Sequence, residues 1–467
     1  MNRFFFFNKN YNENIFNNFY LSLILIIPIS FLNYLALGNN FFLNIFIFIL
    51  GLIFFVKFSK LKDFKVIFFV VIVLFSGLII SKSHEDFTSY HFQHIREISD
   101  GTIKFGLANL DERYFYSSIF SYVQTLFKFK YFDLNLINIP IYLIFLSLVG
   151  YLIIEIQNKR NSFICSILLL LIVLKFRRLS EFGYDYIGQF ILLYIFLEYI
   201  YLGRKNLFEK NIKLILLYFF TILIKVSNIY FLPLILVKLI YKNFFAELFK
   251  NKKILILIIP LILTFASNSF IKTGCFNYLF KDTCIDKKNH SWVFNYDHIE
   301  NSKKLVKNWS RGYFHQKKNQ LTEENYNKNL NWINNWFFGH FTNKILPIII
   351  LLLSIIILNK LFIFDKKYVS RKDRLLLFGS LVSVIIWLIN FPQYRFGFAG
   401  IIIFLIILSH FIIREPKEIN IRKLFLSLII GLIYFNIYNF NRILSEFNRE
   451  DVYKFTNFPW FAIPQTS

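Results

Sequence analysis

The run KVIFFVVIVLFSGLII, residues 65–80, decides the fold class of this chain, because no charged residue follows its opening lysine. As a helix, a run of this length comes close to spanning the roughly 30 Å of hydrocarbon in a bilayer. Apolar runs of similar length recur from end to end of the 467 residues. The chain is 56% hydrophobic and only 17% charged, which is too little charge for a soluble protein of this size. We therefore predict an all-α, polytopic membrane protein.

The apolar runs predict thirteen membrane-spanning helices. Helices are required because a spanning segment must satisfy its own backbone hydrogen bonds, and the sequence lacks the alternating pattern of a β-barrel. The first run lacks the small-residue cleavage site of a signal peptide, so we expect it to be retained. The short pair at 212–225 and 228–241 could also form one re-entrant unit. The predicted spans are 19–37, 41–56, 65–81, 135–155, 162–175, 184–202, 212–225, 228–241, 254–270, 344–361, 374–390, 397–413 and 421–438.

Lysine and arginine gather in six loops that all fall on one side of the predicted span map. By the positive-inside rule this side is cytoplasmic, so the N-terminus lies inside and the C-terminus outside. In a bacterium the protein would be a multi-pass protein of the inner membrane with a periplasmic C-terminus. These loops also account for the net charge of +25, and no basic face remains for nucleic acid. The basic loops are 57–65, 157–161, 203–213, 241–253, 365–374 and 414–423.

The same map predicts the organisation of the chain into four regions. The N-terminal transmembrane region, 1–270, contains a first outer loop at 82–134. A large periplasmic loop follows at 271–343, and its length of about seventy residues is too great for a simple connector. The last two regions are a C-terminal transmembrane region at 344–438 and an outer tail at 439–467.

The stretch SHEDFTSYHFQHI, residues 83–95, directly follows the apolar run quoted above. Helical spacing places Tyr90, Gln93 or His94, and Glu97 on the same face as Asp86. A carboxylate on such a helix at the membrane surface could take a proton from an acceptor hydroxyl as a general base. The bland alternative is a solvated interfacial helix.

Histidines and acids in this stretch also leave a divalent metal open as a cofactor. The spacing of His84, Asp86, His91 and His94 does not match a compact ligand motif such as HExxH. We therefore assign no residue as a metal ligand and name no cofactor with certainty.

Cations on the predicted outer side are exceptions to the charge pattern. Arg177 and Arg178, in FRRLSEFGYDYIG (176–188), could bind a phosphate or pyrophosphate group, because guanidinium forks match phosphate oxygens. They could equally contact lipid headgroups. Asp185 begins the next span, where a carboxylate must face a wet cavity or a partner.

Lys225 and Arg395 also lie at the predicted outer ends of spans. In FPQYRFG, residues 391–397, Pro392 breaks the helix and opens the backbone beside Arg395. Irregular backbone at this depth is tolerated where it lines a cavity or is buried in protein. Arg395 is therefore the strongest candidate outside the first outer loop.

The 271–343 loop contains four of the six tryptophans, Trp292, Trp309, Trp332 and Trp336. Such aromatics can stack on sugar faces, or they can form an ordinary interfacial belt. Cys275 and Cys284 lie in the same loop, and the sequence leaves open whether they form a disulfide. The third cysteine, Cys165, lies in an apolar run and is expected to be an inert buried thiol.

Four segments together resemble the GT-C class of membrane glycosyltransferases, and a related group of bacterial polytopic proteins in particular. The first outer loop of that group contains an aspartate, a Tyr-His pair, a Gly-Leu-x-Asn-Leu run and an arginine. A short acidic segment, a Lys-x-Ser span end and a Pro-x-x-Arg-Phe-Gly segment follow it. The stretch SFIKTGCFNYLFKD, 269–282, resembles a further segment of the group but lacks its prolines. The four segments are DFTSYHFQHIREISDGTIKFGLANLDERYFYSSIF (86–120), FGYDYIG (182–188), IKVSN (224–228) and FPQYRFGFA (391–399).

GT-C enzymes typically use a polyprenyl-phosphate-linked sugar and place a catalytic aspartate in the first outer loop. Carried onto this chain, the resemblance implies that Asp86 is that aspartate, with Glu85 and Asp111 as weaker claimants. One departure is that Asp111-Glu112 precedes Arg113, where the group shows His-Gly. The implied supporting residues are Glu85, Tyr90, His91, Asp111, Arg113 and Asp185. The implied donor-phosphate ligands are Arg395, Lys225, Arg177 and Arg178.

The resemblance implies an inverting glycosyltransferase that acts on a lipid, glycan or protein acceptor at the outer membrane face. Its partners would be the polyprenyl-phosphate sugar donor, the acceptor and membrane lipids. Three alternatives stay open. A flippase for lipid-linked saccharides would favour paired charges within spans and repeated halves. An O-antigen-type polymerase or ligase would place catalysis on residues such as Arg311 and His315, and a non-enzymatic assembly protein would need neither site.

Overall fold

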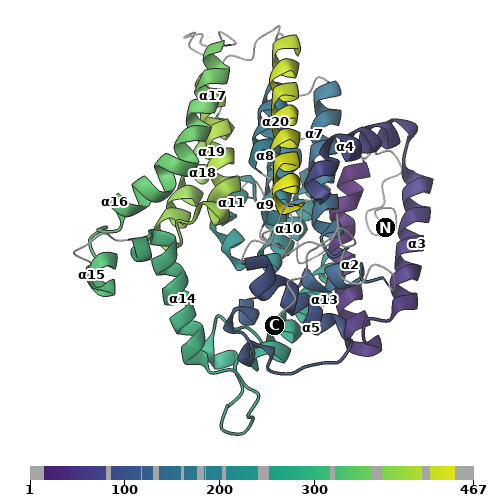
Figure 1. The fold of residues 1–467 in the computed structure, drawn as a ribbon, viewed down its shortest axis with the longest axis vertical. Coiled ribbons are helices and arrows are strands. Elements are labelled where there is room, and N and C mark those ends of the chain that lie inside the picture. The colour runs from purple at the N-terminus through teal and green to yellow at the C-terminus, as the bar shows by residue number, and fades with distance from the viewer. Residues whose placement is uncertain are drawn as a thin grey trace.

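The protein is a bundle of helices in the computed structural model (Figure 1). Cys275 and Cys284 form an isolated antiparallel bridge, and no β-strand is assigned in the part of the chain that the structure describes. The predicted all-α class is therefore confirmed. The structure describes residues 15–79, 86–116, 118–129, 136–158, 162–175, 184, 186–201, 207–239, 252–315, 321–358, 371–412 and 421–447.

In the described residues, helices follow one another along the chain, and three of these helices are π-helices. The first half contains α2 (Ile15–Leu37), α3 (Phe41–Phe58), α4 (Leu61–Ile79), the π-helix η1 (Phe87–His91), α5 (Phe92–Ser99), the 3-10 helices η2 (Leu107–Asn109) and η3 (Glu112–Tyr116), α6 (Ser121–Thr125), α7 (Ile139–Gln157), α8 (Ser162–Lys175), α9 (Ile187–Ile195) and the π-helix η5 (Phe196–Tyr201). The second half contains α10 (Leu207–Ile224), the 3-10 helix η6 (Val226–Phe231), α11 (Leu232–Leu239), α13 (Lys252–Thr273), the 3-10 helix η7 (Lys281–Thr283), α14 (Tyr296–Arg311), the 3-10 helix η8 (Tyr313–His315), α15 (Glu323–Asn327), α16 (Ile333–Trp336), the π-helix η9 (Phe337–Ile345), α17 (Leu346–Leu358), α18 (Arg371–Asn390), α19 (Tyr394–Ile412) and α20 (Ile421–Phe447).

Each of the thirteen predicted spans overlaps a helix in the described residues. Five helical segments are long and apolar enough to cross a membrane, by length and composition. Six more predicted spans coincide with shorter apolar helices, such as Ser162–Lys175 and Tyr394–Ser409. The span count of thirteen therefore stays a prediction. The five segments are Phe19–Leu37, Ile139–Gln157, Ile256–Thr273, Ile333–Ile357 and Asp373–Asn390.

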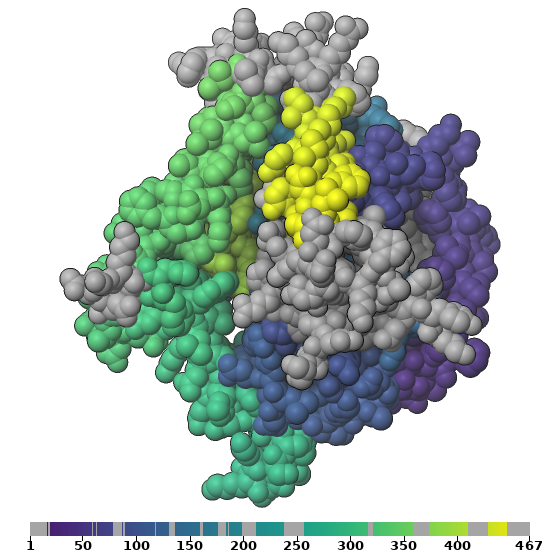
Figure 2. Space-filling model, viewed as in Figure 1, coloured from purple at the N-terminus to yellow at the C-terminus, as the bar shows by residue number. Residues whose placement is uncertain are grey.

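The centre of the bundle is formed by α7, α8 and α9, whose side chains are buried almost all round. Helices that are apolar on every side belong in the core of a large protein or in a membrane. The C-terminal helix α20 packs on α8 and α4, and α18 packs between α11 and α19. On the face drawn in Figure 2, α20 lies between segments from the two halves of the chain.

Large apolar side chains remain exposed on the outside of the bundle. Phe42 on α3, Phe68 on α4 and Phe378 on α18 keep 78%, 69% and 64% of their surface accessible. Contiguous apolar exposure of this kind is rare on soluble monomers and suits contact with lipid. The outside of the bundle is thus compatible with a membrane protein.

Elements from the two predicted outer loops gather at one end of the molecule, where Figure 1 shows α5 and α14 together. The first loop is tied to the second by two hydrogen bonds. The Gly106 amide donates to the Ile271 carbonyl at 2.8 Å, and Asn109 Nδ2 donates to the Trp292 carbonyl at 2.7 Å. Gly106 has a φ of 75°, and a Cβ there would meet the Trp292 carbonyl, so glycine is required for this contact.

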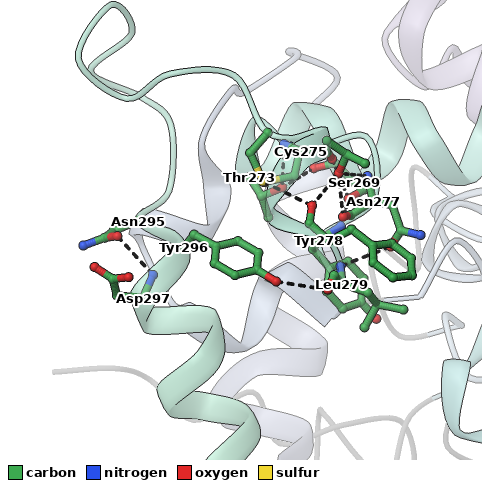
Figure 3. Close-up of a disulfide and its surroundings, with 12 residues drawn as sticks. Ser269, Thr273, Cys275, Asn277, Tyr278, Leu279, Asn295, Tyr296 and Asp297 are labelled. Carbon is green, nitrogen blue, oxygen red and sulfur yellow. Dashed lines mark hydrogen bonds between the residues drawn. A yellow bond between two sulfur atoms is a disulfide. The ribbon is translucent and has the colours of Figure 1, made fainter.

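Cys275 and Cys284, whose pairing the sequence leaves open, are joined by a disulfide. Figure 3 shows the turn that it closes after the end of α13. Ser269 Oγ donates to the Cys275 carbonyl at 2.7 Å, and the Tyr278 amide donates to Ser269 Oγ at 3.2 Å. Tyr296, in the first turn of α14, donates its hydroxyl hydrogen bond to the Leu279 carbonyl at 3.0 Å. The turn therefore fixes where α14 begins.

Candidate functional site

Asp86 and Arg395, the two strongest candidates from the sequence, form an ion pair. Arg395 Nη1 donates to Asp86 Oδ2 at 2.8 Å across 309 positions of sequence. The two side chains are 26% and 19% exposed, so the pair is largely but not fully shielded from solvent. Asp86 directly precedes η1, and Arg395 lies in the first turn of α19. The pair joins the predicted first outer loop to the predicted C-terminal transmembrane region.

The helix break at Pro392 positions Arg395. Helix α18 ends at Asn390 and α19 begins at Tyr394, because proline disfavours helical backbone before it and lacks an amide hydrogen. Two indoles satisfy carbonyls of the break: Trp336 Nε1 donates to Pro392 O at 2.6 Å, and Trp387 Nε1 donates to Gln393 O at 3.0 Å. The irregular backbone predicted here is thus held by buried tryptophans.

A buried glutamine, Gln189, connects three segments that carry candidate residues. Its Oε1 accepts from the Ala399 amide at 2.8 Å, and its Nε2 donates to the Phe396 carbonyl at 3.2 Å and to Asn228 Oδ1 at 3.4 Å. Gly188 permits this approach, because a Cβ there would lie 2.1 Å from Asn228 Nδ2. The start of α9, the turn after Lys225 and the start of α19 are therefore fixed together.

Aromatic rings surround the cations of the site. Lys225 Nζ lies 4.4 Å from the centroid of the Phe396 ring, and Arg395 Cζ lies 5.2 Å from the same centroid. Arg395 Cζ also lies 4.8 Å from a ring of Trp309, which α14 contributes. Lys175 Nζ, at the end of α8, lies 4.6 Å from the Tyr394 ring. Cation–π contacts of this kind hold Arg395 in place beside Asp86 and Lys225 on the Phe396 ring.

Asp111 and Arg113 form a bidentate pair that supports η1. Arg113 Nε donates to Asp111 Oδ1 at 3.0 Å, and Nη2 donates to Oδ2 at 2.6 Å. Arg113 Nη1 donates to Ser89 Oγ at 3.0 Å, and its guanidinium lies 4.9 Å from the Tyr90 ring centroid. The hydrogen bond to Asp111 raises the pKa of Arg113 above its ordinary value. Since both Asp111 oxygens contact Arg113, this geometry fits Asp111 to a positioning role better than to proton transfer.

The two described histidines of the first loop pack against tyrosines. The buried His91 ring lies 4.0 Å from Tyr90 and 4.6 Å from Tyr184 between centroids. The His94 ring lies 5.2 Å from Tyr114. Burial, with smaller contributions from the charges of Lys272 and His91, lowers the pKa of His94 well below its ordinary value. His94 is therefore neutral at pH 7.

A metal site does not form among the residues that the structure describes, since no three His, Cys, Asp or Glu side chains there group closely enough to hold an ion. His84 lies outside those residues. Four further candidates from the sequence, Glu85, Arg177, Arg178 and Asp185, also lie outside the described residues.

Arg311, a candidate for the alternative polymerase or ligase site, holds the large loop against the bundle. Its Nη2 donates to the Ile389 carbonyl at 2.7 Å, and its Nη1 donates to Asn327 Oδ1 at 2.6 Å. Its guanidinium lies 4.8 Å from a ring of Trp332. These contacts place Trp309, on the same helix, beside Arg395.

Sequence reasoning missed Gln189 and Lys175 as parts of the site, and it did not place Trp309, one of the four loop tryptophans, beside Arg395. Gln189 could have been found as the polar residue in the apolar run IGQFILLYI, where an amide needs partners. Trp309 carries no such signal, because its contact with Arg395 depends on how the loop folds back.

Comparison with known protein families assigns this chain to a family. Residues 2–402 match the model of a domain of unknown function, DUF8201, so the chain belongs to that family. The matched segment includes Asp86, Lys225 and Arg395, and it ends within α19 before α20 begins. No curated protein and no solved structure matches the chain.

Proposed function

We propose that this chain is an integral-membrane glycosyltransferase of the GT-C type, with Asp86 and Arg395 at its centre. It transfers a sugar from a polyprenyl-phosphate-linked donor to a lipid, glycan or protein acceptor on the outer face of the inner membrane. The observation that carries the proposal is the 2.8 Å ion pair between Asp86 and Arg395. Sugar transfer needs a base that deprotonates the acceptor hydroxyl and a cation that stabilises the leaving phosphate. This ion pair brings one of each into direct contact.

The proposed reaction is a single displacement. Asp86 takes the proton of the acceptor hydroxyl while that oxygen forms a bond to the anomeric carbon. The bond from the anomeric carbon to the phosphate oxygen breaks, and the lipid phosphate leaves with the electron pair. Arg395 and Lys225 stabilise the charge that develops on this phosphate. Attack from the side opposite the phosphate inverts the anomeric configuration.

The surrounding residues position these two groups. Asp111, Arg113, Tyr90 and His91 hold η1 and with it Asp86. Trp309 and Phe396 keep the Arg395 guanidinium between two rings, so that its charge stays next to the carboxylate. Trp292, a partly exposed tryptophan of the large loop, would stack on a sugar ring of donor or acceptor.

The test is Asp86→Asn, compared with Asp282→Asn, an exposed carboxylate of the large outer loop. Membranes containing each variant are supplied with monosaccharides linked to polyprenyl phosphate or polyprenyl diphosphate and with an envelope extract as acceptor, and release of the lipid phosphate or diphosphate is measured. Loss of the general base should lower the rate by about 100-fold to 10,000-fold, whereas Asp282→Asn should react as wild type. Full activity of a well-expressed Asp86→Asn variant would remove Asp86 from the mechanism.

The variant His315→Ala distinguishes the proposed glycosyltransferase from the alternative polymerase or ligase. A substitution of Arg311 is unsuitable for this purpose, because it would also remove the hydrogen bonds to Ile389 and Asn327 and so disturb the fold. Under the proposed function His315→Ala retains activity and Asp86→Asn does not. The opposite result would move catalysis into the large loop.

A further inference from the structure

A lysine and a histidine on the π-helix η9 form a second group beside the proposed donor site. Lys344 Nζ and His340 Nδ1 lie 3.2 Å apart. An ammonium only donates, so His340 accepts at Nδ1, is neutral, and carries its proton on Nε2. The histidine thus orients the ammonium without removing its charge.

The backbone of η9 places both side chains on one face. A π-helix is rare, is wider than an α-helix, and occurs frequently at functional sites. Within η9, Thr342 Oγ1 and Asn343 Nδ2 both donate to the Phe338 carbonyl, at 2.6 and 2.9 Å. A Cβ added to Gly339 would meet nothing within 4 Å, so the helix is uncrowded next to His340.

This face adjoins the break that carries Arg395. Trp336, immediately before η9, donates to the Pro392 carbonyl at 2.6 Å, and η9 packs against α19. Lys344 on η9 and Arg395 on α19 therefore lie on two elements that pack against each other. Two cations that the fold holds near each other repel, and an anion between them removes the repulsion.

Lys344 is exposed, and none of the ion pairs within the described ranges involves it. It lies in a segment, Ile333–Ile357, that is long and apolar enough to cross a membrane. A lysine in such a segment reaches the membrane interface, faces a wet cavity or has a partner, and the last two arrangements mark functional sites. Arg395 differs from Lys344, because Asp86 already opposes its charge.

We propose that Lys344, oriented by His340, binds the second phosphate of a lipid-linked diphosphate whose first phosphate is held at Arg395. The inference rests on the proposed function and specifies its donor. A sugar phosphate diester carries one negative charge, which Arg395 and Lys225 already match, since Asp86 opposes one of these two cations. A diphosphate carries one more negative charge than this diester, and Lys344 supplies the cation that matches this additional charge. In transfer the anomeric C–O bond breaks, and the lipid diphosphate leaves with the electron pair.

The experiment measures binding of a polyprenyl monophosphate and a polyprenyl diphosphate of equal chain length to the full chain in detergent. Wild type should bind the diphosphate about tenfold more tightly, as one added charged hydrogen bond allows. Lys344→Gln should abolish that preference and leave monophosphate affinity unchanged. Lys344→Arg should keep it, Arg395→Gln should weaken both lipids, and Lys304→Gln, an exposed lysine on α14, should change neither.

Four results would overturn the inference. Equal binding of both lipids by wild type would refute it while leaving the proposed function standing, whereas binding of neither would count against both. A preference that excess phosphatidylglycerol vesicles remove would show that Lys344 serves bulk lipid headgroups. Equal weakening of both lipids by Lys344→Gln would place Lys344 at the first phosphate instead.

Discussion

At the scale of single residues, the pair of Asp86 and Arg395 could serve the fold, the chemistry or both. The sequence singles out each residue, one by its place behind an apolar run and one by its place behind a proline. It gives no sign that they touch, because 309 positions separate them and only tertiary packing joins them. A contact of this kind is the part of the site that sequence reasoning could not predict.

Exchanging the two charges distinguishes a structural role of the ion pair from a catalytic role. Asp86→Asn and Arg395→Gln should each lower stability by about 1–3 kcal/mol, as expected for a partly buried pair that loses one member. The double exchange Asp86→Arg with Arg395→Asp restores opposite charges and should recover much of the thermal unfolding midpoint. Activity should stay lost, because the base and the phosphate ligand have changed places. Recovery of activity in the exchange would show that the pair is only structural.

Gln189 is a second residue whose effect is measurable. Gln189→Leu removes the hydrogen bonds to the Ala399 amide, the Phe396 carbonyl and Asn228 within an almost fully buried site. Leaving such groups unsatisfied costs about 1–3 kcal/mol, so the unfolding midpoint should fall. Gln157→Leu, at the exposed end of α7, is the matched control and should change the midpoint little. A stable Gln189→Leu variant would mean that the three segments are held by packing alone.

His94 gives the fold a pH dependence. In the folded chain its pKa lies well below its ordinary value, whereas in the unfolded chain it lies near 6.5. Below pH 6.5 the unfolded chain therefore binds a proton that the folded chain does not. As a result, the free energy of unfolding decreases as the pH is lowered. By pH 5.5 the loss approaches about 1.4 kcal/mol. Unfolding midpoints at pH 8 and 5.5 should differ more for wild type than for His94→Gln, and equal differences would exclude His94 as the cause.

At the scale of elements, the apolar runs predicted where helices lie, and Pro392 predicted the break before α19. The bounds of the helices follow from composition, because a helix is the way in which an apolar run such as 65–80 satisfies its own backbone hydrogen bonds. The π-helices η1, η5 and η9 were not predicted, because their hydrogen bonding depends on neighbours such as Thr342 and Asn343. Two of the three carry groups assigned here to substrate binding or to its support.

The disulfide turn between α13 and α14 is the element whose stability is easiest to test. By the loop-entropy model, linking cysteines nine positions apart stabilises the fold by about 2–3 kcal/mol. Dithiothreitol should therefore lower the unfolding midpoint of wild type. A variant with both Cys275→Ser and Cys284→Ser should start at the lower value and ignore the reductant. A midpoint in wild type that the reductant leaves unchanged would show that the link contributes nothing to the turn.

At the scale of the whole molecule, α5 and α14 lie at one end of the bundle (Figure 1), and the ion pair of Asp86 with Arg395 joins the first loop at that end to α19. The positive-inside pattern predicts that this end faces out, and a disulfide beside it suits an oxidising compartment. The same orientation is required by the proposed function, because the donor would be used at the outer face. Orientation therefore decides the function as strongly as any residue does.

Single introduced cysteines measure that orientation directly. Lys304→Cys lies on the exposed side of α14, and Lys60→Cys lies in the first basic loop, 57–65, at an exposed position. The buried Cys165 and the linked Cys275 and Cys284 leave little background reactivity. A membrane-impermeant maleimide should label Lys304→Cys in intact cells, and should label Lys60→Cys only after the membrane is opened. Labelling in the reverse order would place Asp86 and Arg395 on the cytoplasmic side, where a donor presented at the outer face could not reach them.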